Sequence, residues 1–301
     1  MHERQSIGLR FAQPDHNNDG SLLMNDLKVH KLPLSGMRAL VTGGAQGIGA
    51  GICLGLASAG AAVAVVDRQV DKAQFLAKQI VHGGGRAVAV QADIALEEGC
   101  LQAVTKTITE LGGLDILVNC AAPTRDRGML GKITAADWEI HQQIVLKATV
   151  ILSDTASDYL AESGKGSIIN ISSVTSHSVA IDQCSWSYHA SKAALDQLTR
   201  WLAVRLGGLC IRVNSIAPGL VDRDIGPKLS DNPQHRAIIN EIVPLGRAGN
   251  ARDIAQAVVF LCSTQSSYIT GQVLTIDGGL GLNELFGASL RAFKAGAGAP
   301  K

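Results

Sequence analysis

The sequence predicts an α/β protein whose core is a doubly wound sheet of seven parallel strands with helices on both faces. From residue 38 onward, short apolar runs alternate with longer segments whose apolar residues recur at helical spacing. The strand-like runs are apolar at almost every position, as expected when helices cover both faces of a parallel sheet. Hydrophobic residues make up 46% of the chain and aromatic residues only 4%, so we expect a core of Ala, Val, Ile and Leu.

Each element follows from this alternation in order. The strands are expected at residues 38–42, 62–66, 87–91, 115–118, 167–171, 211–216 and 273–276, and the helices at residues 47–58, 70–81, 97–111, 135–160, 188–206 and 253–262. The wider gap between Ala217 and Asp253 contains Pro218, Pro227, Pro233 and Pro244. We expect an irregular lobe there, lying over the site, because ligands bind beyond the carboxyl ends of such strands.

The organisation predicts one domain over residues 36–282, with an N-terminal extension over residues 1–35 and a C-terminal tail over residues 283–301. Within the extension, residues 15–26 partly match a calcium-binding loop, with Asp15, Asp19 and Gly20 in place. The last position is Asp26 rather than a bidentate Glu, and no second loop pairs with it. A flexible tail is the favoured interpretation, and a natural start at Met24 is a third alternative.

Charge and composition exclude several classes of function. A net charge of +1 gives no electrostatic reason to expect nucleic acid or an anionic membrane as a partner. No apolar run approaches the roughly 20 residues of a membrane span, and the N-terminus lacks the apolar stretch of a signal peptide. The six cysteines are far apart, which favours buried thiols over disulfides or a metal site. We therefore expect a cytoplasmic protein without a metal.

A glycine-rich loop follows the first predicted strand and opens the first helix. Gly43 permits the tight turn, Gly47 allows close approach of a pyrophosphate, and Gly49 allows close packing of helix on sheet. The amino end of that helix presents free N–H groups to the phosphates. Asp67 ends the second strand, where its carboxylate would accept hydrogen bonds from a ribose and repel a 2′-phosphate. NAD is therefore favoured over NADP, although the neighbouring Arg68 leaves NADP open.

Tyr188 and Lys192 are four residues apart and lie on one face of a predicted helix. An ammonium group beside a phenol favours the phenolate and so lowers the pKa of the tyrosine from its ordinary value of about 10. Tyr188 can then act as a general base toward an alcohol or a general acid toward a ketone.

Over residues 36–282, about four-fifths of the chain, the sequence resembles the short-chain dehydrogenase/reductase family. The segments that match are TGGAQGIG (42–49), VVD (65–67), AD-I (92–94), N-C-A-A (119–122), INISS (169–173), Y-H-A-S-K (188–192), IRVNSIAPG (211–219) and YITGQVLTIDGG (268–279). The resemblance implies a Rossmann-type fold and hydride transfer between a nicotinamide and a small-molecule alcohol or ketone.

The resemblance also implies residue roles. Ser173 would hydrogen-bond the reacting oxygen, Tyr188 would exchange its proton, and Lys192 would hold the nicotinamide ribose and tune the tyrosine. The residues expected to contact the cofactor are Gly43, Gln46, Gly47, Ile48, Gly49, Asp67, Arg68, Asp93, Ile94, Asn119, Ala121, Tyr188, Lys192, Pro218, Gly219 and Val221. A homotetramer is expected because family members often form one.

The chain departs from the family pattern at three places. Ala122, followed by a proline, stands where a glycine is usual, and Val145 stands where an asparagine helps to relay protons through a bound water. A backbone carbonyl, or one of the nearby glutamines Gln142 and Gln143, is the alternative holder of that water. The spacing from Ser173 to Tyr188 is slightly long, so Ser172 is the alternative catalytic serine.

The substrate is expected to be a small polar secondary alcohol: a sugar, polyol, sugar acid or dihydrodiol. Arg125, with Arg127, is a candidate for binding a carboxylate. His177 is a candidate for binding a polar substrate, and Trp186 is a candidate for lining the substrate pocket. Two alternatives remain open: an NADPH-dependent carbonyl reductase, and a dinucleotide-binding sensor that keeps the fold without turnover.

Overall fold

The structure is a computed structural model that describes residues 32–123, 134–180, 184–222, 228–282 and 287. Its contacts divide the chain into two units, Met1–Leu32 and Pro33–Lys301. All the elements below belong to the second unit. The candidate calcium loop, Arg125, Arg127 and most of the predicted C-terminal tail lie outside the described residues.

Seven parallel strands form one sheet, in the spatial order β3-β2-β1-β4-β5-β6-β7. The strands are β1 (Arg38–Thr42), β2 (Ala62–Asp67), β3 (Arg86–Gln91), β4 (Ile116–Asn119), β5 (Ser167–Ile171), β6 (Arg212–Pro218) and β7 (Val273–Ile276). The order reverses between β1 and β4, which is where such sheets open a crevice for a ligand. The predicted α/β, doubly wound, Rossmann-type fold is confirmed.

The longer helices alternate with the strands along the chain. They are α1 (Gly47–Ser58), α2 (Val70–His82), α3 (Glu97–Leu111), α4 (Ala135–His141), α5 (Ala148–Glu162), α6 (Trp186–Gly207), α7 (Pro233–Ile242) and α8 (Ala251–Cys262). Among the described helices, none combines the length and apolar character that crossing a membrane would require.

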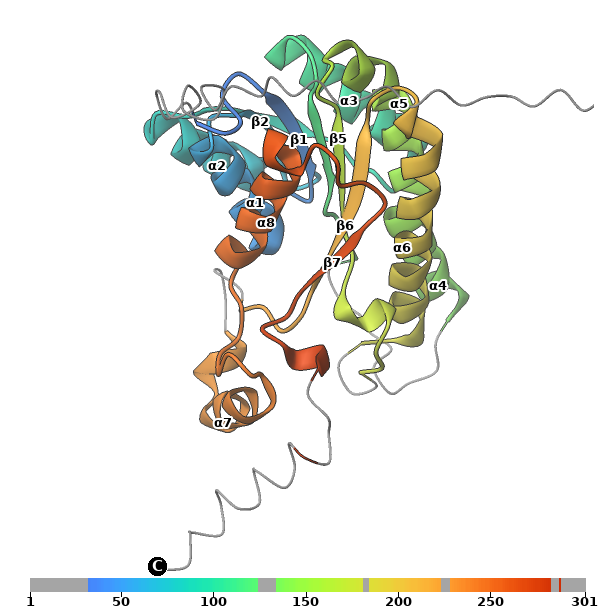
Figure 1. The fold of residues 1–301 in the computed structure, drawn as a ribbon. Helices are drawn as coiled ribbons and strands as arrows, with labels where there is room; N and C mark the ends of the chain where they lie inside the picture. The colour runs from blue at the N-terminus through green and yellow to red at the C-terminus, as the bar shows by residue number, and fades with distance from the viewer. Residues whose placement is uncertain (1–31, 124–133, 181–183, 223–227, 283–286, 288–301) are drawn as a thin grey trace, which may run out of the picture. The chain divides into compact units, whose positions relative to one another are not determined.

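Two apolar layers lie on the two faces of the sheet (Figure 1). One layer packs α1, α2 and α8 against β1, β2 and the central strands, with Ile52, Leu76 and Ile254 buried in it. The other packs α3, α5 and α6 against the opposite face, with Leu152 and Leu202 buried there. Strands β2, β4 and β5 are buried at every residue, which explains why their sequences are apolar without alternation.

A seam of small residues joins α1 to α8. A Cβ on Gly55 would lie 2.7 Å from the Cβ of Ala255, and a Cβ on Gly51 would overlap the side chain of Ala251. The two helices can approach this closely only because α1 has no side chain at these two positions. The glycines therefore set the distance between the helix that follows the glycine loop and the helix that follows the lobe.

The structure refines one prediction about the elements and contradicts another. Residues 135–160 are helical throughout, as expected, but a turn of π-helix, Gln142–Lys147, separates α4 from α5. The lobe expected to be irregular contains α7, which starts at Pro233 with Asn232 as its N-cap; the Asn232 side chain accepts from the N–H groups of Gln234 and His235. Proline at the first helical position fits a helix start, so Pro233 initiates a helix within the segment that was expected to be irregular.

The described cysteines are all free thiols, but only half are buried. Cys53, Cys100 and Cys262 are buried, Cys120 and Cys184 are partly exposed, and Cys210 is exposed. The expectation of buried thiols is thus correct for the three on helices α1, α3 and α8 and wrong for Cys210.

Candidate functional site

The predicted site residues that the structure describes gather largely at one edge of the sheet, because the strands are parallel and in register. Thr42 at the end of β1 pairs with Val66 of β2 and with Asn119 of β4. Asn119 pairs in turn with Asn170 of β5, and β6 follows beside β5. The segments that leave these strands therefore lie next to one another. They carry the glycine loop, Asp67, Ala121, Ser173 and Gly219.

The glycine loop has the geometry that its sequence predicts. Gly43 and Gly47 adopt positive φ angles of 62° and 55°, a conformation that favours glycine. A Cβ on Gly43 would lie 2.8 Å from the Cα of Ala121, and a Cβ on Gly49 would overlap the carbonyl oxygen of Gly43. A Cβ on Gly47 would meet nothing within 4 Å, so this side of the loop is open.

The amino end of α1 has neither a side-chain cap nor an acidic residue that would compete with a bound anion. Its N-cap residue Gln46 has extended backbone and makes no capping hydrogen bond with its side chain, and the first turn of α1 carries no acidic residue. The Gln46 side chain instead accepts from Lys72 Nζ at 3.0 Å. An open loop followed by uncapped N–H groups fits a pyrophosphate.

Asp67 lies beside the glycine loop with its carboxylate buried. One oxygen accepts from the N–H of Ala45 at 3.2 Å and the other from the N–H of Gln69 at 2.9 Å. A carboxylate has room for further hydrogen bonds on both oxygens, so these contacts orient it without exhausting it. Arg68 beside it is exposed. The residues present fit an adenosine ribose with free hydroxyls.

The remaining predicted cofactor residues continue along the same edge. Asp93 caps its own turn by accepting from the N–H of Ala95 at 3.1 Å. Ala121 and Cys120 both donate their N–H groups to the Thr42 hydroxyl, at 3.3 and 3.1 Å. Ile94 and Ile48 are partly buried against the two core layers, Pro218 ends β6, and Gly219 and Val221 begin the lobe.

A chain of hydrogen bonds connects β4 to α6 through the interior. Asn119 Nδ2 donates to Asn170 Oδ1 at 2.9 Å, and Asn170 Nδ2 donates to Thr199 Oγ1 at 2.9 Å. Thr199 Oγ1 donates onward to the carbonyl of Leu195. Among the described residues, Asn119 Oδ1 is buried without a hydrogen-bond partner.

Helix α6 brings Tyr188 and Lys192 together. Ser185 caps the helix by accepting from the N–H of Tyr188, and the Lys192 ammonium lies 5.6 Å from the centre of the Tyr188 ring. Lys192 Nζ donates to the carbonyl of Ile171 at 2.7 Å, which ties α6 to the end of β5. Burial lowers the pKa of Lys192 to about 8, and the nearby Asp196 carboxylate opposes that shift.

The two candidate serines face different partners. Ser172 is buried and its hydroxyl lies 3.4 Å from the carbonyl of Lys192, to which it donates. Ser173 caps the short 3₁₀ turn η4 (Val174–Ser176), and its Oγ accepts from the N–H of Thr175. Ser172 is thus engaged with the backbone of α6, which favours Ser173 as the serine that faces a ligand.

The structure does not gather the candidate substrate residues. His177 is exposed and bonds to Ser176 Oγ through Nδ1 at 3.1 Å. Trp186 is about half exposed and stacks on Trp138 of α4, with ring centroids 5.0 Å apart. Trp186 and Tyr188 are two residues apart on α6, a spacing that places them on different faces of a helix. Arg125 lies outside the described residues.

Val145 is buried within the π-helical turn, and its backbone carbonyl accepts from Thr149 Oγ1 at 2.8 Å. Gln142 is partly exposed and Gln143 is exposed.

Sequence reasoning missed two residues that the structure brings to this site. His141 is buried, and its ring meets the Tyr188 ring edge-on at 6.1 Å, while its Nδ1 bonds to the carbonyl of Asp137. Thr175 contacts Ser173 with its side chain. The signal for Thr175 is local, since a hydroxyl two residues after a serine often closes a small turn. For His141 there is none, because the π-turn that follows it is not visible in the sequence.

The fold and this edge of the sheet define a nicotinamide-dependent oxidoreductase, and the comparisons with known proteins agree. The family described as Enoyl-(Acyl carrier protein) reductase matches residues 43–281. The chain belongs to the short-chain dehydrogenase/reductase family and is an enzyme that acts on CH–OH groups. In the described part of the chain, no three His, Cys, Asp or Glu side chains gather as a metal site would require.

Its relatives act on different substrates. A 3-oxoacyl-[acyl-carrier-protein] reductase of Aquifex aeolicus is 34% identical over 83% of this chain and 99% of its own length. A glucose 1-dehydrogenase of Gluconobacter oxydans is 35% identical over 84% of this chain and 95% of its own. A 7α-hydroxysteroid dehydrogenase, solved with NADH and 7-oxo glycochenodeoxycholic acid, is 33% identical over 83% of this chain and 96% of its own, with a TM-score of 0.74.

Proposed function

We propose that this enzyme interconverts a small polar secondary alcohol and its ketone with NAD(H), using Tyr188 as the general acid or base. The observation that carries the proposal is the arrangement at the ends of β5 and α6. There the buried Lys192 ammonium lies beside the Tyr188 ring, and Ser173 follows the strand whose carbonyl Lys192 binds. These contacts support the roles proposed for Ser173, Tyr188 and Lys192.

In this proposal, a bound nicotinamide would accept a hydride from the carbon of the alcohol, or would donate a hydride to the carbon of the ketone. Tyr188 takes the hydroxyl proton in the first direction and returns it in the second. The Lys192 charge stabilises the phenolate form of Tyr188, since an ammonium nearby favours an anion. Ser173 donates a hydrogen bond to the oxygen that gains or loses its proton.

The preference for NAD rests on Asp67. Its buried carboxylate is held beside the glycine loop by two backbone N–H groups, so it cannot easily turn away from a 2′-phosphate. The preference for a sugar, polyol, sugar acid or dihydrodiol is supported by the low aromatic content of the chain and by the glucose 1-dehydrogenase relative. The alternative, an NADPH-dependent carbonyl reductase, is supported by the exposed Arg68 and by the 3-oxoacyl reductase relative.

Steady-state turnover tests the proposal. The purified protein is assayed with NAD or NADP and a panel of polyols, aldoses, sugar acids and cyclic diols, beside Tyr188→Phe. We expect turnover with NAD that Tyr188→Phe abolishes and that the control Tyr159→Phe, on the exposed face of α5, retains. Tight NAD binding without turnover on any compound would instead support the non-catalytic sensor and make Val145→Asn the variant to assay.

Asp67→Asn separates the two cofactors. The variant removes the charge and keeps one side-chain oxygen, which can accept from either Ala45 or Gln69 in place of the two oxygens of the carboxylate. We expect the ratio of NAD affinity to NADP affinity to fall about 10-fold or more, the effect of a like-charge contact worth roughly 1.4 kcal/mol. Asp71→Asn, exposed on α2, is the matched control. Equal affinity of the wild type for both cofactors would contradict the role of Asp67.

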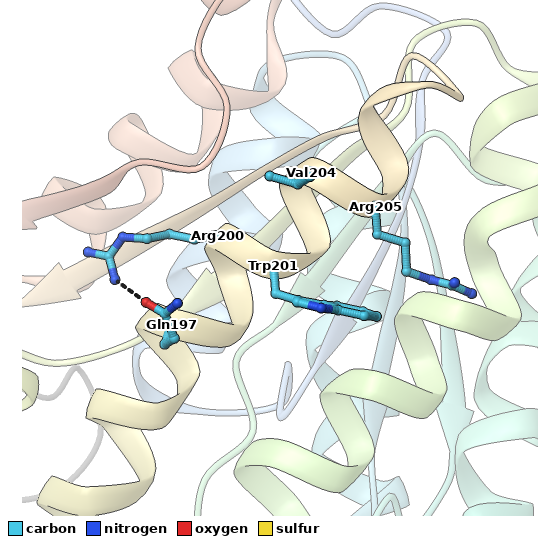
Figure 2. A pocket seen from close by; sticks show the side chains of 5 residues that line it. All are labelled: Gln197, Arg200, Trp201, Val204 and Arg205. Carbon is cyan, nitrogen blue, oxygen red and sulfur yellow. Dashed lines mark hydrogen bonds between the residues drawn. The ribbon is translucent and has the colours of Figure 1, made fainter.

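We further propose that the enzyme is a homo-oligomer in which a second copy covers the outer face of α6. Figure 2 shows this face, a surface hollow lined by Gln197, Arg200, Trp201, Val204 and Arg205. Val204 is 85% exposed and Trp201 is 56% exposed, and contiguous apolar exposure of this kind marks interfaces.

The charges around this hollow favour a second copy as its partner. Arg205 pairs with Asp154 of α5 at 2.9 Å, and Arg200 of α6 and Asp158 of α5 are both exposed. A face that carries both signs of charge can pair with its own copy across a two-fold axis, since each sign can meet the other. The tetramer and the cytoplasmic location expected from the sequence stay predictions.

A further inference from the structure

Thr175 directs both of its hydrogen-bond donors at one atom, the Oγ of Ser173. Its hydroxyl donates to Ser173 Oγ at 2.9 Å and its backbone N–H donates to the same oxygen at 3.2 Å. Ser173 is 9% exposed and Thr175 is 7% exposed, so water does not compete freely for these contacts. The short η4 turn that follows β5 brings the two residues together.

The two contacts from Thr175 limit the hydrogen bonds that the Ser173 hydroxyl can still make. A serine hydroxyl has two lone pairs and one proton. Because Thr175 fills both lone pairs of Ser173, the Ser173 proton is the only hydrogen-bonding capacity that remains. Without Thr175, Ser173 would be equally free to accept a hydrogen bond, for example from the hydroxyl of an alcohol substrate.

We propose that Thr175 is a positioning residue that makes Ser173 an obligate donor to the reacting oxygen. The inference rests on the proposed function, since it requires Ser173 to contact that oxygen. Thr175 itself does not touch the substrate.

The contact between Thr175 and Ser173 should stabilise the transition state more than it stabilises the bound substrate. The chain from the Thr175 hydroxyl through the Ser173 hydroxyl to the reacting oxygen runs in one direction, and each bond polarises the next. In ketone reduction, negative charge develops on that oxygen as the hydride reaches the carbon, so a polarised donor gains strength as the reaction proceeds. Loss of Thr175 should therefore lower kcat and leave KM nearly unchanged.

Three variants test the inference in ketone reduction. Thr175→Val keeps the shape and removes the hydroxyl, Thr175→Ala removes the side chain beyond Cβ, and Thr175→Ser restores the hydroxyl. We expect kcat to fall about 3- to 10-fold in the Val and Ala variants, the size of one lost neutral hydrogen bond, and to recover in the Ser variant. Thr107→Val, which removes a buried threonine hydroxyl that donates to Ala103 on α3, is the control and should keep kcat.

A double-mutant comparison separates a positioning role from a structural one. In a Ser173→Ala background there is no hydroxyl to orient, so adding Thr175→Val should leave the residual kcat unchanged. An equal loss in both backgrounds would show that Thr175 only supports the fold and would overturn the inference, as would wild-type kcat in both Thr175→Val and Thr175→Ala. Thermal unfolding of every variant identifies losses that come from misfolding.

Different results would contradict the proposed role of Ser173 and the proposed role of Thr175. If Ser173→Ala turns over as fast as the wild type, the assignment of Ser173 is wrong and the inference falls with it. If Ser173→Ala loses turnover while Thr175→Val retains it, the proposed function stands and the inference alone is overturned.

Discussion

Lys192 is a buried cation at the centre of the candidate site, and its surroundings decide how its charge responds to pH. The residue is 2% exposed, and burial lowers its pKa from an ordinary value of 10.5 to about 8. The ammonium form is thus held at a cost in folding free energy, against which its hydrogen bond to Ile171 and the nearby Asp196 carboxylate act.

This shift predicts how stability depends on pH. Between about pH 8 and 10.5 the unfolded chain binds more protons at Lys192 than the folded chain, so the free energy of unfolding should rise with pH across that window. The rise should reach about 3 kcal/mol, from roughly 1.4 kcal/mol for each pKa unit, and be absent below pH 8. Urea unfolding of the wild type and Lys192→Met between pH 7 and 10 measures the difference.

Lys192→Met should lack this contribution, so the stability of the wild type relative to the variant should rise with pH. Lys106→Met, which removes an exposed lysine of α3, controls for the loss of a positive charge. A difference between wild type and Lys192→Met that stays constant or falls from pH 8 to 10 would show that Lys192 is not buried as described.

At this scale the sequence predicts residue types better than it predicts contacts. Tyr188 and Lys192 could be paired from their spacing because a helix places residues four apart on one face. The contact between Ser173 and Thr175 could not be predicted with its direction, because it depends on the backbone angles of a three-residue turn. His141 reaches the Tyr188 ring from another helix, which no local pattern records.

The packing of α1 against α8 gives a prediction at the scale of elements. Gly55→Ala should lower the free energy of unfolding, because the added Cβ would lie 2.7 Å from that of Ala255. Overpacking costs about 1–3 kcal/mol and should outweigh the gain of about 1 kcal/mol in helix propensity. Thermal or urea unfolding measures it, with Gly83→Ala at the end of α2, where the nearest atom is 3.5 Å away, as the control.

A second substitution shows whether the clash itself is the cause. Ala255→Gly removes the methyl group that Gly55→Ala would meet, so the double variant should be more stable than the sum of the two single effects predicts. Strictly additive effects would mean that the seam does not set the distance between the two helices.

The accuracy of the element predictions follows from their physical basis. The strand Arg38–Thr42 and the helix Gly47–Ser58 begin and end where the sequence predicts, because a buried apolar run and a glycine-rich turn mark the boundary between them. The segment over residues 135–160 has one continuous helical pattern, yet it contains a π-turn. One extra residue in a turn shifts the backbone hydrogen bonds without disturbing the apolar pattern enough to detect.

The proposed oligomer gives a prediction for the whole molecule. Val204→Asp should shift the protein to a smaller species, because it places a charge at the most exposed apolar position in the hollow on α6. Val81→Asp, at a position of α2 that is 53% exposed, should keep the wild-type mass. Sedimentation at micromolar concentration measures both. A monomeric wild type, or an unchanged mass for Val204→Asp, would contradict the proposed interface.

The hydrogen-bond chain from Asn119 through Asn170 to Thr199 has a consequence for the alignment of α6. Apolar contacts alone would let a long helix rotate slightly about its axis at little cost, since the hydrophobic effect is not directional. Thr199 lies on the same stripe of α6 as Tyr188 and Lys192, so its hydrogen bond to Asn170 fixes the rotation that aims both of them. A variant with apolar residues in place of Asn119, Asn170 and Thr199 could unfold at the same temperature as the wild type and yet hold Tyr188 in a less precise orientation. Thermal stability and catalytic competence are therefore separable properties of this molecule.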